Sequence, residues 1–279
     1  MSAAAFPCEP PHAGHQRAVG DLAVVMKRRG ATTVLADLRQ EGCLKARFPR
    51  PAGWAEAVLL NSSGGIAGGD RLRSALGVAA GAAACFTGQA AERFYRALPD
   101  DQPAHLRTRI TIGAGAAAEW LPQESILFDG AALDRALDVD LAADGWFLGV
   151  EMLLFGRAAM GERMRHARVR DTIRIRRAAR LVWQDSIRLD GATPLSLPAI
   201  AAGAQGVATL VHVAPDAEAR LDVLRAAWAT APAEAAASAW RGMVVGRVVA
   251  GDGACLRATI VAGLQALRAG RPLPRVWLC

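Results

Sequence analysis

The sequence lacks the cysteine and histidine patterns that define disulfide frameworks and zinc sites. Its five cysteines are odd in number and widely scattered, without a Cys-x-x-Cys motif. The five histidines form no cluster with cysteine at zinc-ligand spacing. We therefore expect a protein of the reducing cytoplasm that holds no permanently bound metal or other cofactor.

Lysine is also rare, because only Lys27 and Lys45 accompany the arginines in a chain of net charge +7. A basic balance favours acidic partners without identifying them. The N-terminal segment has neither a basic region nor a continuous apolar stretch, so no signal peptide is expected. The most apolar stretch, 197–214, is rich in Ala and Gly and lies between Pro198 and Pro215, which argues against a membrane span.

What the sequence has is a series of short apolar or alternating runs separated by Gly, Pro or Asp. One of them, 106–112, places Leu106, Thr108, Ile110 and Ile112 on one face. This spacing predicts a mainly β protein, and the regular strand-then-helix rhythm of a parallel α/β sheet is missing. We expect a loose tail over 1–17 and a single domain over 18–279.

Two helices are expected in the C-terminal third. The first covers 216–229, with apolar residues at helical spacing after Asp216, which is a candidate N-cap. The second covers about 254–268, and Gly270 and Pro272 follow it as stop signals. Trp277 is a large apolar residue close to the end of the chain, so we expect it to be docked.

The segment NSSGGIAGGDRL, 61–72, is unusually rich in glycine. Its spacing does not match a dinucleotide fingerprint, and Asp70-Arg71 stands where a phosphate-binding loop needs Lys and Ser or Thr. A nucleotide-binding enzyme that uses Gly64–Arg71 nevertheless remains one alternative. The other interpretation is a tight turn in which glycines adopt positive φ or allow close backbone approach.

The segment 163–180 contains eight arginines. Arg168, Arg170, Arg174 and Arg176 alternate with other residues, as one face of a strand would. A nucleic-acid-binding β protein is a second alternative, although the segment lacks interleaved aromatic residues for base stacking. A solvated strand face and a docking surface for an acidic protein are the other interpretations.

Five motifs occur in order: GGIAGGDRL (64–72), QAAERFYR (89–96), EWLPQESILFDGA (119–131), FGRAAMGE (155–162) and PRVW (274–277). Together they resemble the urease accessory protein UreD family, called UreH in some organisms. The resemblance covers about residues 61–162 and the C-terminus, and 163–270 match only loosely. This chain departs from the family where Ser62-Ser63 precede the paired glycines and where Arg93-Phe94 precede Tyr95-Arg96.

The resemblance implies an elongated, mainly β chaperone without enzymatic activity that takes part in nickel insertion, the assembly of the urease metallocenter. It also implies a hetero-oligomeric complex with apo-urease and UreF, and through UreF with the GTPase UreG, but with no nucleic acid or membrane. Nickel is expected to pass transiently through the protein. Carboxylates in apolar surroundings suit transit better than storage, because a relay site must release its ion. The candidates are Asp70, Glu124, Asp129, Glu151 and Glu162; candidate partner-binding residues are Arg168, Arg170, Arg174, Arg176 and Trp277.

Overall fold

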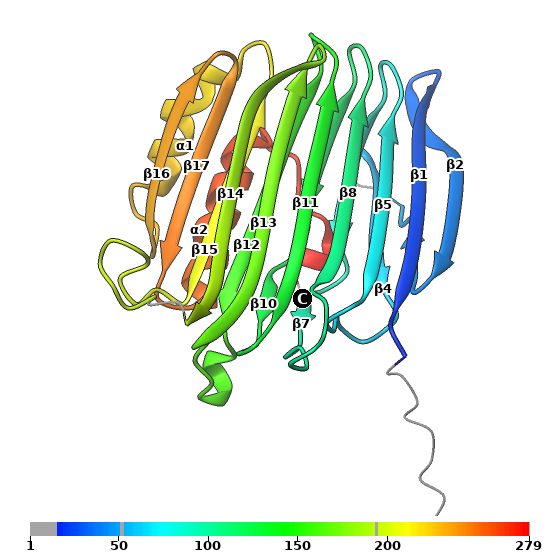
Figure 1. The fold of residues 1–279 in the computed structure, drawn as a ribbon. Coiled ribbons are helices and arrows are strands. Elements are labelled where there is room, and N and C mark those ends of the chain that lie inside the picture. The colour runs from blue at the N-terminus through cyan, green and yellow to red at the C-terminus, as the bar shows by residue number, and fades with distance from the viewer. Residues whose placement is uncertain (1–15, 51–52, 193–194, 279) are drawn as a thin grey trace, which may run out of the picture.

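Two β-sheets face each other in the computed structural model, which describes residues 16–50, 53–192 and 195–278 (Figure 1). The mainly β prediction is therefore confirmed. Sheet A has the order β14 (Arg180–Ala192), β13 (His166–Arg177), β11 (Ala132–Leu141), β8 (Ala104–Ile112), β5 (Arg71–Val78), β1 (Val19–Arg29) and β2 (Thr32–Gly42). Sheet B has the order β16 (Glu234–Trp240), β17 (Met243–Ala250), β15 (Gly206–Val213), β12 (Trp146–Phe155), β9 (Ala117–Leu121), β6 (Ala83–Gly88), β4 (Ala55–Asn61) and β3 (Leu44–Arg47), and the short β10 (Ser125–Leu127) joins β12 to β7 (Glu92–Phe94).

The middle strands of both sheets run parallel without helices between them. In sheet A, β5, β8, β11 and β13 are parallel neighbours, as are β6, β9 and β12 in sheet B. Parallel strands need a crossover connection, which is usually a helix. Here the chain alternates between the sheets, so that a strand of one sheet forms part of the crossover for the other. This explains why the sequence shows no strand-then-helix rhythm.

The main hydrophobic core lies between the sheets, where alternate side chains of the strands meet. In β8 the predicted alternation is confirmed: Leu106, Ile110 and Ile112 join this core, whereas Arg107 and Arg109 are exposed on the outer face. The pleat of each strand thus decides which residues enter the space between the sheets.

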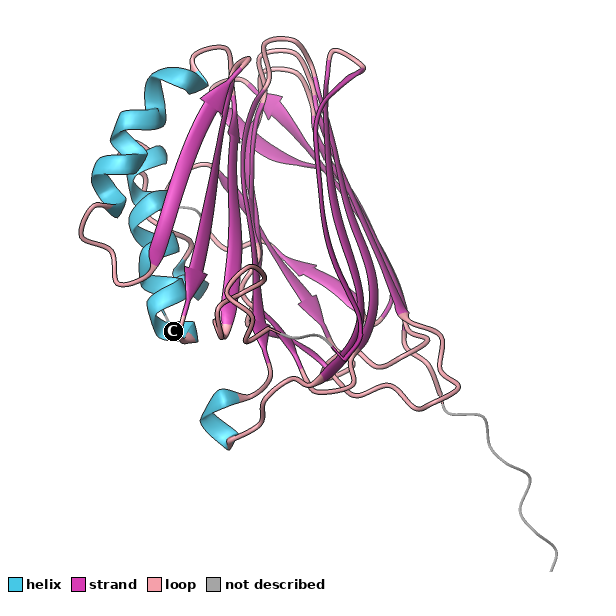
Figure 2. Ribbon diagram, turned by 60° about the vertical axis from the view of Figure 1, so that its left-hand side comes forward, coloured by secondary structure: helices cyan, strands magenta, loops and turns pink. Residues whose placement is uncertain are grey.

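The helices α1 (Leu221–Trp228) and α2 (Gly253–Leu267) lie against the outer face of sheet B (Figure 2). Both predicted helices are confirmed within a few residues. Leu224 and Trp228 of α1 and Ile260 and Leu264 of α2 form a second apolar cluster with that face. Sheet B is therefore covered on both sides, and the outer face of sheet A is not covered by the described helices.

The helix ends follow the sequence signals only in part. Asp252 caps α2, because its carboxylate accepts a hydrogen bond of 2.7 Å from the Cys255 amide. The prediction that Asp216 caps the first helix is wrong: its side chain makes no capping hydrogen bond, and the short turn η2 (Ala217–Arg220) precedes α1. The remaining short helical turns are η1 (Ala158–Met160) and η3 (Arg275–Leu278).

Residues 1–15 of the predicted tail lie outside the described residues, and the single-domain interpretation stays a prediction. Arg17, placed in that tail by the sequence, forms an ion pair with Asp101. Across 16–50, 53–192 and 195–278, no helix has the combined length and apolar character needed to cross a membrane.

Candidate functional site

The glycine-rich segment 61–72 forms a tight turn that packs on Tyr95. Gly64, Gly65 and Gly69 have φ values of 81°, 138° and 83°. A Cβ atom on Gly65 would lie 2.4 Å from the Tyr95 ring, and the Tyr95 hydroxyl donates a hydrogen bond of 2.7 Å to the Gly64 carbonyl. Backbone geometry and close packing therefore account for the glycines of this segment.

Asp70, the first candidate nickel ligand, is buried in backbone contacts. Its carboxylate accepts hydrogen bonds from the amides of Ala18 (2.7 Å) and Ala67 (2.8 Å), and its carbonyl accepts one from the His105 amide (2.7 Å). Asp70 thus joins the glycine turn to the starts of β1 and β8. These contacts give it a structural role at the loop, and Asp70 does not line either of the two cavities described below.

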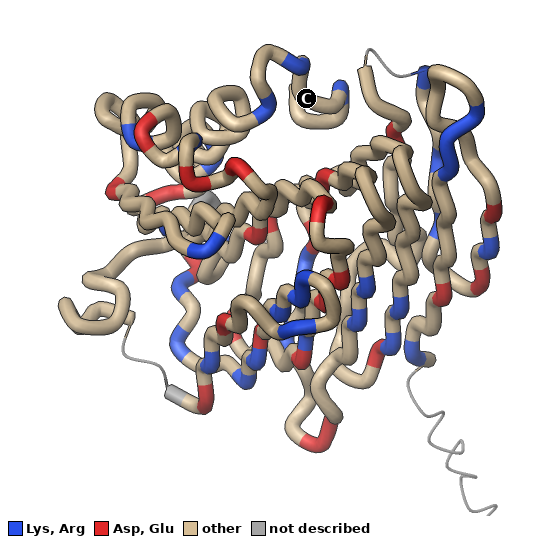
Figure 3. The backbone as a smooth tube through the Cα atoms, turned by 90° about the horizontal axis from the view of Figure 1, so that it is seen from above, with Lys and Arg blue, Asp and Glu red and all other residues tan. Residues whose placement is uncertain are grey.

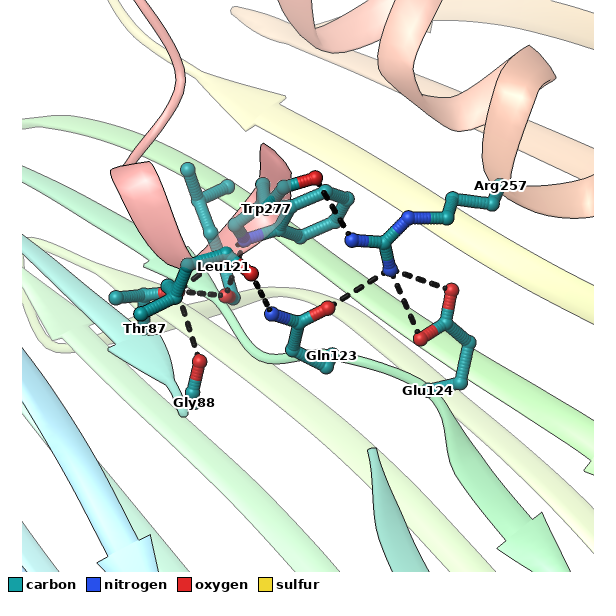
Figure 4. A network of polar contacts seen from close by, with 8 residues as sticks. Thr87, Gly88, Leu121, Gln123, Glu124, Arg257 and Trp277 are labelled. Carbon is teal, nitrogen blue, oxygen red and sulfur yellow. Dashed lines mark hydrogen bonds and ion pairs between the residues drawn. The ribbon is translucent and has the colours of Figure 1, made fainter. Parts of the chain in front are cut away.

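Glu124 belongs to a network that holds the C-terminal tail (Figure 4). Arg257 of α2 donates to both carboxylate oxygens of Glu124 at 2.8 and 3.0 Å, to Gln123 at 2.7 Å and to the Trp277 carbonyl at 2.9 Å. The Gln123 amide donates to the Val276 carbonyl at 2.6 Å. Glu124 therefore fixes the arginine that binds the tail.

Asp129 organises a loop at the end of the sandwich. It accepts hydrogen bonds from the amides of Arg165 (2.8 Å) and His166 (2.9 Å) and pairs with Arg96 at 3.2 Å. Partial burial would raise the pKa of Asp129, but these hydrogen bonds and the nearby cation outweigh it and lower the pKa. A carboxylate held by two amides is well suited to shaping this loop.

Glu162 makes a local ion pair with Arg157. Both of its oxygens accept hydrogen bonds of 3.0 Å from the guanidinium, and these bonds lower the pKa of Glu162 below its ordinary value. Both residues belong to the segment around η1, so the contact closes that turn. The structure does not bring Glu162 next to Glu151.

Glu151 is the candidate that lies inside the sandwich, in an ion cluster that joins the two sheets. Its carboxylate accepts a hydrogen bond of 2.7 Å from the Trp120 indole and pairs with Arg135 of sheet A at 2.9 Å. Arg135 also donates to both oxygens of Asp171, at 2.5 and 2.9 Å, and to the Ser125 hydroxyl at 2.9 Å. One guanidinium therefore faces two carboxylates from opposite sheets.

The environment of the cluster shifts its protonation equilibria. Burial raises the pKa of Glu151; Arg135 opposes this effect and Asp171 adds to it. Burial would lower the pKa of Arg135, but the two carboxylates outweigh it and the pKa is raised. Arg135 therefore stays charged, and a nearby cation stabilises the ionised form of Glu151.

Two cavities lie between the sheets on either side of this cluster. The first has a volume of about 400 Å³; Arg135, Ser125 and Trp120 line it, and its wall includes the exposed residue Gln89. The second has about 360 Å³, and Asp171 lines it. Glu151 lines both cavities. The ion cluster is therefore the boundary between them.

The second cavity contains another pair of opposite charges across the sheets. Arg247 of β17 pairs with Asp185 of β14 at 2.7 Å and donates to the Thr209 hydroxyl at 2.5 Å. Polar groups thus continue from the ion cluster towards β14, the edge strand of sheet A, and β17, which lies next to the edge strand of sheet B. This series of charged and hydroxyl groups runs through an otherwise largely apolar core.

The candidate partner-binding arginines lie on the outer face of sheet A. Arg174 pairs with Asp138 at 2.7 Å, Arg176 pairs with the same carboxylate at 3.4 Å, and Arg168 donates to the Asp101 carbonyl at 3.0 Å. Arg170 is exposed on the same face. Figure 3 shows basic and acidic segments side by side along this layer. The face is therefore a mixed lattice of charges and not a uniformly basic patch.

Trp277 lies inside the protein. The residue is 4% exposed, and its indole donates hydrogen bonds of 3.2 Å to the Thr87 hydroxyl and the Leu121 carbonyl. The expectation that Trp277 is docked is confirmed. Any effect of Trp277 on partners must act through the tail that it anchors.

Arg135 and Asp171 are the site residues that sequence reasoning missed. Both stand at inward-facing positions of alternating strands: Arg135 lies between Leu133 and Leu137, and Asp171 between Val169 and Ile173. The signal available in the sequence was a charged residue at a strand position where the residues two places before and after it are apolar. Among the described residues, no three or more His, Cys, Asp or Glu side chains gather in a group that could hold a metal ion.

Comparisons with known proteins identify the family. The sequence profile of the UreD urease accessory protein family matches residues 18–278. The urease accessory protein UreD of Methylobacterium sp. (strain 4-46) is 47% identical, with 89% of this chain and 90% of that protein covered. The UreD proteins of Dinoroseobacter shibae (45% identical, 94% and 92% covered) and Sinorhizobium medicae (46% identical, 94% and 96% covered) are similar. The chain therefore belongs to the UreD family of urease accessory proteins.

Proposed function

We propose that this protein is a cytoplasmic maturation chaperone that binds apo-urease and UreF, and UreG through UreF, and that helps to deliver nickel to the urease active site. Membership of the urease accessory family supports the role in urease maturation. The observation that carries nickel delivery is the position of Glu151, a buried carboxylate that lines both inter-sheet cavities. We propose that Ni²⁺ moves through these cavities past Glu151.

The energetics of a buried ion favour such a route. An unpaired divalent cation in an apolar interior has a prohibitive desolvation cost, so it needs water or oxygen ligands along its way. Ser125, Glu151, Asp171 and Thr209 offer hydroxyl and carboxylate oxygens between the sheets. Because oxygen ligands without imidazole or thiolate bind Ni²⁺ weakly, the ion can leave again.

The chaperone role needs no catalytic group in this chain. We propose that nucleotide hydrolysis belongs to UreG and that nickel is a transient cargo and not a resident cofactor. The packing of Gly65 on Tyr95 supports a structural role for the glycine turn, because that side of the loop is filled by a side chain of the protein itself. The nucleotide-binding alternative therefore has less support.

We propose the outer face of sheet A as a partner surface. Arg168 and Arg170 have exposed side chains there, whereas Arg174 and Arg176 are partly neutralised by Asp138. Alternating charges suit a partner with a complementary charge pattern, since mismatched surfaces would bring like charges together. The mixed charge also gives less support to nucleic-acid binding than a uniformly basic patch would.

Glu151→Gln tests the proposed nickel route. The variant keeps the size of the side chain and an acceptor for Trp120, but removes the negative charge. With the complete set of accessory proteins, we expect an unchanged yield of the complex and a several-fold lower nickel content of urease. Glu234→Gln, on the exposed edge strand β16, is the matched control. Full nickel loading with Glu151→Gln would contradict the route, and a parallel loss of the complex would indicate a structural role.

A further inference from the structure

The Arg135 guanidinium forms ion pairs with two carboxylates that belong to opposite sheets. Its guanidinium contacts Glu151 of sheet B and Asp171 of sheet A, and the side chains of the three residues are 12%, 8% and 6% exposed. One positive charge is thus shared between two negative charges at the boundary of the two cavities. The cluster has a formal charge of −1 when all three groups are ionised.

A second cation can enter this cluster only in competition with the guanidinium. Arginine does not lose its proton in proteins, so a rise in pH cannot remove the positive charge that occupies the space between the two carboxylates. Removal of the arginine without replacement would leave two buried carboxylates unpaired, which is strongly unfavourable. The guanidinium and an arriving divalent ion therefore exclude each other at the same oxygens.

We propose that Arg135 is a built-in competing cation that closes the passage between the two cavities until a divalent ion displaces it. On return, the guanidinium displaces the ion into the next cavity, so the carboxylate pair holds the ion only weakly. This inference rests on the proposed function, because it assigns the residue that regulates the proposed route. The competition makes the site a relay and prevents it from becoming a store.

Removal of Arg135 should convert the relay into a trap. We would measure Ni²⁺ binding by equilibrium dialysis, and thermal unfolding with and without Ni²⁺, on the purified full-length chain. Relative to the wild type, Arg135→Gln should bind one Ni²⁺ at least about tenfold more tightly. Ni²⁺ should also raise the unfolding temperature of the variant more than that of the wild type. The additional change Glu151→Gln should abolish both effects.

Arg247→Gln is the matched control, because Arg247 is also an inter-sheet arginine but pairs with one carboxylate, Asp185. It should not gain Ni²⁺ affinity. If Arg135→Gln does not fold, Arg135→Lys provides the test: a point charge cannot hold both carboxylates as the planar fork does, so Ni²⁺ should still bind several-fold more tightly than in the wild type. Unchanged Ni²⁺ affinity in the folded variant would overturn the proposal.

The binding measurement involves no urease, so it separates this inference from the nickel route. If Arg135→Gln traps Ni²⁺ and also slows urease activation, both proposals are supported. If it traps Ni²⁺ while activation is normal, the competition at Arg135 stands and the route past Glu151 is wrong. If Ni²⁺ affinity does not rise, the role of Arg135 is wrong whatever the activation rate.

Discussion

At the scale of single residues, similar carboxylates have different roles because their surroundings differ. Asp70 accepts hydrogen bonds from backbone amides, and Glu124 holds the arginine that binds the tail. Glu151 pairs with a guanidinium that it shares with Asp171 between two cavities. The type of residue does not distinguish these environments. The partners supplied by distant parts of the chain decide whether a carboxylate supports a loop or lines a passage.

Asp70→Ala should destabilise the protein by about 1–3 kcal/mol, because the amides of Ala18 and Ala67 lose a buried charged acceptor. Chemical denaturation measures this change, and Asp37→Ala, at an exposed position of β2, is the control. Urease activation should fall only in step with the yield of the complex. Normal stability with a selective loss of nickel delivery would instead give Asp70 a part in transport.

Asp138→Asn should change the response of stability to acid. The hydrogen bond from Arg174 lowers the pKa of Asp138, so its stabilising effect is complete above the ordinary pKa of about 3.9 and is lost as the pH falls through the lowered value. The variant should be less stable at pH 7 by about 1 kcal/mol. The loss is no larger because Arg174 is partly exposed and solvent screens the ion pair. The difference should shrink below about pH 4.

Chemical denaturation between pH 7 and pH 2 measures this effect. Asp190→Asn is the control, because Asp190 forms a more exposed pair with Arg188 and should change stability by less than about 0.5 kcal/mol. A difference between Asp138→Asn and the wild type that stays constant down to pH 2 would show that the pair does not act through the charge of Asp138.

At the scale of elements, the C-terminal tail joins α2 to sheet B. Trp277 donates hydrogen bonds to groups of β6 and β9, while Arg257 of α2 binds the Trp277 carbonyl. Glu119 of β9 adds a buried ion pair of 2.9 Å with Arg268, directly after α2. The helix, the tail and the sheet therefore form one packed unit, in which removal of one part exposes the others.

Deletion of residues 270–279 should abolish a soluble complex, because it removes Trp277 from a buried site and exposes the apolar surface beneath it. Trp277→Ala should by itself cost about 3–5 kcal/mol in stability. Complex yield in the soluble fraction and chemical denaturation are the measurements. Leu278→Ala is the control, since Leu278 is 76% exposed. A normal complex formed by the truncated protein would show that the tail is dispensable.

At the scale of the whole molecule, the alternation of the chain between two sheets creates the inter-sheet space. In the middle of the sandwich, each passage through sheet A and sheet B adds one parallel strand to both, so residues distant in sequence meet across the sandwich. Arg135 and Glu151 are on successive strands of different sheets, and Asp171 is on the next strand of the first. The cavities lie where these inward-facing polar residues replace apolar ones.

The local sequence determined the strand character, both helices and the buried face of β8, because alternation and helical spacing are properties of neighbouring residues. The ordered motifs also determined the family. Only the tertiary structure decided which carboxylates share a guanidinium. The reason is that the order of strands in the two sheets pairs β11 with β13 and places β12 opposite them in the other sheet, and this order depends on contacts between distant parts of the chain. Glu151 and Glu124 look alike in sequence, yet Glu151 lines two cavities and Glu124 holds the arginine that binds the tail.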